Sequence, residues 1–173
     1  MISKLEAAKR NLRMAIRLFF EQGDAVAVHT LGASAQAIVR DIARARGLEH
    51  ASILHDHPDV PAHLRREWIA KLNAARNFFK HADQDPEGIL EFDESQNELV
   101  LLDAVLVLSQ LDSDGLEEAN VFVGWITTGH PELRPAVSNN VIGDYCARNN
   151  VLASDFERFR ELCDERILVD RPR

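Results

Sequence analysis

Apolar residues recur at intervals of three and four through most of the 173-residue chain, which is the spacing that buries one face of a helix. The first segment shows the pattern, with Leu5, Leu12, Ile16 and Phe19 on one side. The short apolar piece Ile89–Phe92 fits an extended segment over the core better than a strand of a sheet. The spacing therefore predicts an all-α fold.

Capping signals divide this pattern into seven predicted helices. The S-x-x-E box, in which a serine and a glutamate bond the first free amides of a helix, begins three of them at Ser3, Ser95 and Ser154. Asp24 and Asp114 begin two others. The predicted helices span about residues 3–22, 24–46, 61–83, 95–111, 114–128, 136–148 and 154–167. We therefore expect residues 1–173 to form one single-domain helical bundle of about six to seven helices.

The composition is that of an ordinary globular domain, with 46% hydrophobic and 28% charged residues. No apolar run approaches the roughly 20 residues of a membrane span, and the charged N-terminal segment does not resemble a signal peptide. Cys146 and Cys163 do not form a C-x-x-C pair, so we expect two reduced, partly buried thiols. These observations predict a cytoplasmic protein that does not enter a membrane.

Charge is distributed unevenly along the chain. Residues 1–82 carry 13 Lys and Arg against 8 Asp and Glu, whereas residues 83–173 carry 7 against 20, which gives the net charge of −8. The net charge argues against indiscriminate nucleic-acid binding. The asymmetry indicates either a polyanion-binding face or an acidic half that packs against the basic half, and we favour the second interpretation.

Histidines and aspartates crowd the predicted loop before the third helix. His55, His57 and His63 lie there in a spacing that can bind zinc or iron, but an H-x-H pair alone is a weak signal. A solvated loop is the simpler interpretation, so we predict no metal site and no cofactor. A small-ligand or metal-binding bundle stays open as an alternative function. Elsewhere, His29 falls near an apolar helix face and is predicted to be buried with one hydrogen bond.

The predicted helix over residues 61–83 carries the residues most suggestive of chemistry, Arg76, Asn77 and His81, in the order R-N-F-F-K-H. Arginine can bind a phosphate and histidine can transfer a proton near neutral pH. Five residues correspond to about 500°, or about 140° around the helix axis. Arg76 and His81 therefore reach one phosphate only if the helix end loosens or a second copy lies alongside.

This motif resembles the R-x(4–6)-H motif of the HEPN superfamily (higher eukaryotes and prokaryotes nucleotide-binding); Arg44 and His50 give a lower-ranked second match. Its members are small helical bundles, and many are dimeric, metal-independent endoribonucleases. The resemblance implies that Arg76 holds the scissile phosphate, that His81 is the general acid or base, and that Asn77 takes the polar position after the arginine. It also implies a homodimer that binds RNA or a nucleotide. Residues 1–111 would be the HEPN-like core and residues 112–173 additional helices.

The sequence leaves open whether the chain is an enzyme. The main alternative is a non-catalytic interaction protein whose acidic second half binds a basic protein partner.

Overall fold

The computed structural model describes residues 1–48, 52–55, 61, 63–81, 83, 85–112, 114–136 and 140–165. Within these ranges the chain forms seven α-helices, one short 3-10 helix and no strand, so the predicted all-α bundle is confirmed. The helices are α1 (Lys4–Phe20), α2 (Ala25–Ala45), α3 (Arg65–Phe78), α4 (Gln96–Leu111), α5 (Glu117–Gly129), α6 (Val141–Asn149) and α7 (Phe156–Leu162), with the 3-10 helix η1 (Pro131–Ala136) between α5 and α6.

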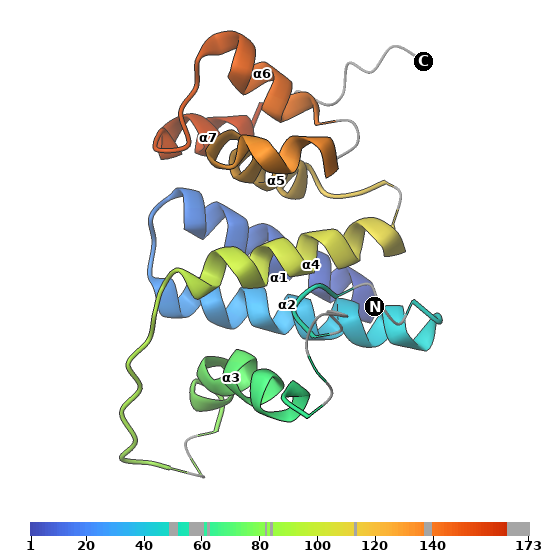
Figure 1. The fold of residues 1–173 in the computed structure, drawn as a ribbon, viewed down its shortest axis with the longest axis vertical. Coiled ribbons are helices and arrows are strands. Elements are labelled where there is room, and N and C mark those ends of the chain that lie inside the picture. Colours follow the sequence, from blue (N-terminus) through green and yellow to red (C-terminus); the bar gives the residue numbers. More distant parts are fainter. Residues whose placement is uncertain are drawn as a thin grey trace.

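The helices lie in three tiers (Figure 1). In the middle tier, α2 packs along both α1 and α4. On one side of this tier lie α5, α6 and α7, and α5 contacts both α1 and α4. On the opposite side lies α3, which packs against α2. Helix α3 is therefore an outer element, separated from α5–α7 by the middle tier.

The hydrophobic core runs through the middle tier. Leu12 and Ile16 of α1 and Leu101 of α4 are fully buried there. Helix α4 buries one side, with Leu101, Ala104, Val105, Val107 and Leu108. An aromatic cluster continues the core towards α5 and α7 and contains Phe19, Phe20, Phe122, Trp125, Phe156 and Phe159. These contacts join the middle tier to the α5–α7 tier.

Two of the predicted N-terminal caps are confirmed. The Ser3 hydroxyl accepts a hydrogen bond from the Glu6 amide at 3.1 Å, and the Asp24 carboxylate accepts one from the Ala27 amide at 2.8 Å. Each satisfies an amide that the first turn of a helix leaves free. The first helix, predicted to about residue 22, ends at Phe20, and Gln22 after it has the left-handed conformation.

The predicted caps of the later helices are wrong. Ser95 makes no side-chain cap, and its amide donates to the Asp93 carboxylate at 3.0 Å. Asp155, rather than Ser154, caps α7. Helix α5 begins at Glu117 without a side-chain cap, so Asp114 does not begin it. The helix predicted from residue 136 begins at Val141, and the predicted end of the last helix at 167 lies outside the described residues.

The helix predicted over residues 61–83 is shorter than expected at both ends. The Pro61 carbonyl accepts from the amides of Leu64 and Arg65 at 2.9 and 3.1 Å, so a turn leads into α3. At the other end, α3 stops at Phe78, and the Phe79 side chain packs inward against aromatic rings from other segments. His81 therefore lies beyond the helix, not in its last turn as predicted.

Cys146 and Cys163 are unpaired and buried, as two structural thiols would be. Burial raises the pKa of the Cys163 thiol to about 12. A thiol held in its neutral form is a poor nucleophile. Cys163 is therefore not a candidate for covalent catalysis.

Candidate functional site

The R-N-F-F-K-H segment forms the C-terminal turn of α3 and the residues just after it. Asn77 and His81 are exposed, and Arg76 is half-buried. The His81 amide donates to the Asn77 carbonyl at 3.0 Å, so one more turn follows the helix end. The His81 imidazole lies 3.9 Å from the Asp83 carboxylate. The two exposed groups can both be reached by a ligand from solvent.

Arg76 is the partly buried cation of this segment. Its Nε atom is buried and has no hydrogen-bond partner among the described residues, and its guanidinium forms no ion pair with any of them. Burying part of a cation without a partner costs free energy, which a bound anion would recover. No described contact joins Arg76 to His81, in line with their predicted separation around the helix axis.

An aromatic cluster holds this end of α3 against the bundle. The Phe79 ring meets the rings of His29 and Phe92 edge-on, with centroids 5.7 and 5.3 Å away, and the His29 and Phe92 centroids lie 5.1 Å apart. His29 Nδ1 lies 3.0 Å from the Asn97 side-chain oxygen. Burial lowers the pKa of His29, and the bond to Asn97 opposes this shift. The predicted buried histidine with one hydrogen bond is confirmed.

A buried polar network holds the N-terminal half of α3. The Asp103 carboxylate of α4 is fully buried and accepts from Gln36 Nε2 at 2.6 Å, from the Ser52 hydroxyl at 3.0 Å and from the Leu54 amide at 3.2 Å. The Leu54 carbonyl in turn accepts from the Trp68 indole at 2.6 Å. Asp103 is therefore linked to α3 through residues 52–55.

The loop histidines do not come together as a metal site in the described part of the chain. His55 is buried, with Nδ1 3.0 Å from Gln36 Nε2, whereas His63 is exposed. His57 lies outside the described residues, as does His50 of the second motif match. No group of three or more His, Cys, Asp or Glu among the described residues could hold a metal ion.

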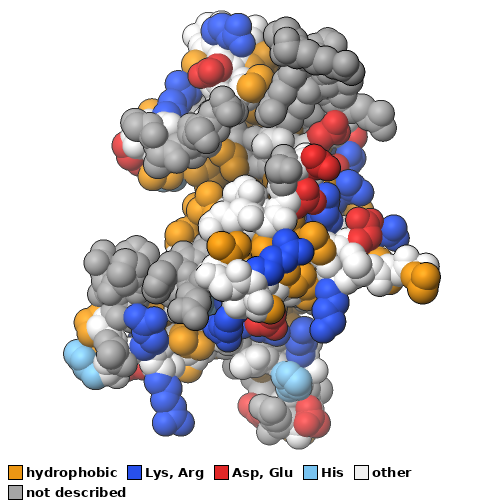
Figure 2. Space-filling model, turned by 90° about the vertical axis from the view of Figure 1, so that its right-hand side faces the viewer, with side chains coloured by type: hydrophobic (Ala, Val, Ile, Leu, Met, Phe, Trp, Pro, Cys, Tyr) orange, Lys and Arg blue, Asp and Glu red, His pale blue; other side chains and the backbone are white. Residues whose placement is uncertain are grey.

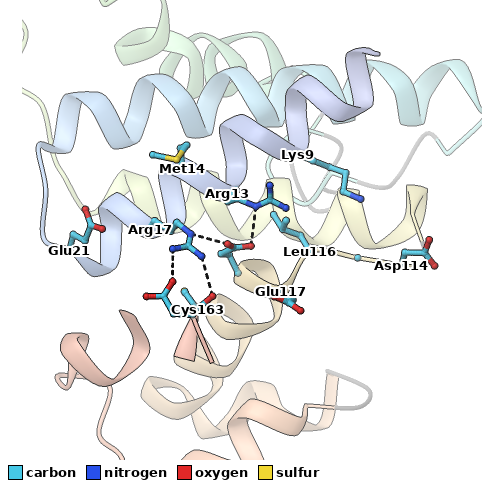
Figure 3. A pocket seen from close by; sticks show the side chains of 12 residues that line it. Lys9, Arg13, Met14, Arg17, Glu21, Asp114, Leu116, Glu117 and Cys163 are labelled. Carbon is cyan, nitrogen blue, oxygen red and sulfur yellow. Dashed lines mark hydrogen bonds and ion pairs between the residues drawn. The ribbon is translucent and has the colours of Figure 1, made fainter. Parts of the chain in front are cut away.

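The cations of α1 face acidic residues from the second half of the chain (Figure 3). Arg17 pairs with Glu118 at 2.9 Å and with Asp164 at 2.7 Å, and Lys9 pairs with Asp112 at 2.7 Å. The hydrogen bond from Lys9 lowers the pKa of Asp112. An open groove of about 810 Å³ between α1 and α5 is lined by Lys9, Arg17, Glu118 and Asp164. The predicted packing of the acidic half against the basic half is confirmed for this helix.

The cations of α3 are arranged differently. Lys71 pairs with Glu67 of the same helix at 3.0 Å, whereas the exposed Arg66 and Lys80 form no ion pair within the described part of the chain. Figure 2 shows Lys, Arg and His side chains on the lower part of the molecule, where α3 lies. The loop that follows α3 is acidic and exposed, and carries Asp83, Asp85, Glu87, Glu91, Asp93 and Glu94.

Comparison with known proteins returns no match. No family model, no curated protein and no solved structure is similar to this chain. Among the helices that the structure describes, none has both the length and the apolar character needed to cross a membrane. The candidate site therefore rests on its own geometry.

Sequence reasoning missed the residues that position α3, chiefly Asp103, Gln36 and Asn97. One signal was available for Asp103, because it is a lone carboxylate inside the apolar run Leu99–Leu108 of a predicted helix. A carboxylate in such a place requires hydrogen-bond donors from elsewhere in the fold. The identity of those donors could not be read from the sequence.

Proposed function

We propose that this protein is a HEPN-like metal-independent endoribonuclease with its site at the C-terminal turn of α3. The observation that carries the proposal is the uncompensated guanidinium of Arg76 in the same turn as the exposed His81. Residues 1–111 would be the HEPN-like core, with α5–α7 as additional helices. Three cations of α1 pair with acidic residues from the second half of the chain, namely Lys9, Arg13 and Arg17. Helix α3, with cations that form no ion pair among the described residues, is therefore the better candidate for binding a polyanion.

In this proposal Arg76 binds the scissile phosphate and stabilises the charge that develops on it. His81 takes the proton of the RNA 2′-hydroxyl, whose oxygen bonds to phosphorus while the bond to the 5′-oxygen breaks. The departing 5′-oxygen takes a proton from water, and the other product ends in a 2′,3′-cyclic phosphate. Asn77 is exposed beside Arg76 and would orient the RNA.

On a continuous helix, residues 76 and 81 would lie about 140° apart. His81 follows the end of α3, and no described contact joins it to Arg76. We therefore propose that the active form is a homodimer in which Arg76 of one copy and His81 of the other meet at the same RNA. Size measurement by light scattering tests the dimer. A monomer at the concentrations where RNA is cleaved would contradict it.

The decisive experiment is incubation with a mixed RNA pool in EDTA. We expect cleavage with 2′,3′-cyclic ends, reduced by about 10² or more in His81→Ala, the usual effect of removing a general acid or base. Cleavage by Arg76→Ala should be reduced by a similar factor. His63→Ala is the matched control, because His63 is also exposed but lies before α3 and outside the motif. Equal cleavage by wild type and His81→Ala, or no cleavage at all, would overturn the proposal.

A second candidate function rests on the exposed acidic loop after α3. Its six carboxylates form no ion pair with Lys or Arg in the described residues, in contrast to those that face α1. A basic protein partner would complement this loop. Replacing Glu91, Asp93 and Glu94 by their amides should abolish binding of an Arg- and Lys-rich peptide at low salt. The control replaces three other carboxylates, those of Glu132, Asp144 and Glu157, by their amides. If the two triple variants lost peptide binding equally, the loop would not be a specific binding site.

A further inference from the structure

Helix α3 is held mainly at its two ends. Ala75 is the one buried residue of α3, whereas α1 has five buried residues. A helix with so little buried apolar surface gains little free energy from its own packing. Its position therefore depends on the Trp68 bond to Leu54 and on the contacts of Phe79.

The hydrogen bonds around His29 define its tautomer. Asn97 Nδ2 donates to the Ala25 carbonyl at 3.1 Å, which leaves the Asn97 oxygen to face His29 Nδ1. His29 Nδ1 must therefore carry the proton and donate it. His29 Nε2 is then an acceptor, and it is buried without a donor among the described residues. The neutral imidazole is thus fixed, with one unsatisfied nitrogen in an aromatic surrounding.

We infer that His29 is a positioning residue for the proposed ribonuclease site: held by Asn97, its neutral ring fixes Phe79 and thereby the turn that carries Arg76, Asn77 and His81. The inference rests on the proposed function for its catalytic consequence, but the placement of the turn is a property of the protein alone. Phe79 lies between Asn77 and His81 in the chain and is the residue of that turn that contacts the His29 ring. A change at His29 reaches the turn through this contact.

Protonation of His29 should release the turn. Imidazolium would put a charge among the rings of Phe79 and Phe92, where water does not reach it. His29 loses its proton more easily in the docked state, so its stabilisation of docking is complete above the ordinary histidine pKa of about 6.5 and falls as pH drops below it. The turn should therefore be held at pH 7.5 and loosened at pH 5.5.

Other titratable groups flank this cluster on each packed element. They are Asp24 before α2, Arg76, Lys80 and His81 at the α3 turn, Glu91 and Asp93 beside Phe92, and Glu98 after Asn97 on α4. None of them forms a described hydrogen bond or ion pair with His29. Burial raises the pKa of Glu98, and His130 opposes that shift from the far side of α4. His81 is the other histidine near the turn and must be controlled for.

The test is amide hydrogen exchange of residues 79–81, corrected for the intrinsic effect of pH. In wild type we expect protection to fall about tenfold more between pH 7.5 and 5.5 than the correction predicts, because an exposed imidazole is about 90% charged at pH 5.5. His29→Phe, which keeps an aromatic ring but cannot titrate, should show no such fall. His81→Ala is the matched control and should keep it.

A fall that persists in His29→Phe, or no fall in wild type, would overturn the inference. Replacing both His29 by Phe and Asn97 by Leu removes the unpaired amide oxygen if the single variant folds poorly. RNA cleavage separates the two proposals. A fall in cleavage below pH 6.5 that is less steep in His29→Phe than in wild type supports positioning, because only His81 then titrates. Normal exchange behaviour without any cleavage rejects only the proposed function.

Discussion

Helices α1 and α3 are both basic and amphipathic, yet they are held in the fold in different ways. Helix α1 buries Ala8, Leu12, Ile16 and other apolar residues, and two of its cations, Arg13 and Arg17, pair with acidic residues of α5 and the C-terminal segment. Helix α3 buries little, depends on polar residues from other helices, and has cations without an ion pair among the described residues. The comparison suggests that α1 has a structural role and that α3 is the element available for binding.

The largest expected effect comes from removing the carboxylate that anchors α3. Asp103→Ala should lower the free energy of unfolding by about 3–5 kcal/mol, because Gln36, Ser52 and Leu54 would lose their common buried acceptor. Urea denaturation measures this change in the free energy of unfolding. Asp85→Ala, at an exposed position, is the control and should change stability by less than about 0.5 kcal/mol. An equally small effect at Asp103 would show that the network does not stabilise the fold.

A matched pair of isoleucines tests the packing of the two helices directly. Ile16→Ala on α1 should cost about 2–5 kcal/mol, since the side chain is fully buried in the core. Ile69→Ala on α3 removes the same atoms from a half-buried position and should cost less than about 1.5 kcal/mol. Urea denaturation of both variants gives the comparison. Equal costs would mean that α3 is packed as firmly as α1.

The smallest expected effects on stability come from replacing one arginine on each helix. Arg17→Gln should cost about 1–3 kcal/mol, because the nearly buried Glu118 loses its closest partner. Arg66→Gln should change stability by less than about 0.5 kcal/mol but weaken RNA binding, since Arg66 is exposed and unpaired in the described structure. Thermal unfolding and binding at several salt concentrations measure the two effects. If Arg17→Gln weakened RNA binding and Arg66→Gln did not, the RNA-binding face would lie on α1.

Local chemistry in the sequence was sufficient to predict several features. The order and approximate bounds of the helices, and the caps at Ser3 and Asp24, depend on residues within one or two turns of each other. The burial of His29 followed from its place beside an apolar helix face. The end of α3 was predicted too late because it depends on where the Phe79 ring meets His29 and Phe92, which is not a local property.

Tertiary structure alone decided which residues anchor α3 and which cations stay unmatched. Gln36 and Asp103 are 67 positions apart, and Arg17 and Asp164 are 147 positions apart. The sequence could indicate that the basic and acidic halves attract each other, but not that Arg17 takes acidic partners while Arg76 has none among the described residues. A side chain's hydrogen bonds and ion pairs depend on the donors and acceptors that the packed fold brings within about 3 Å, and chain neighbours do not determine those distances.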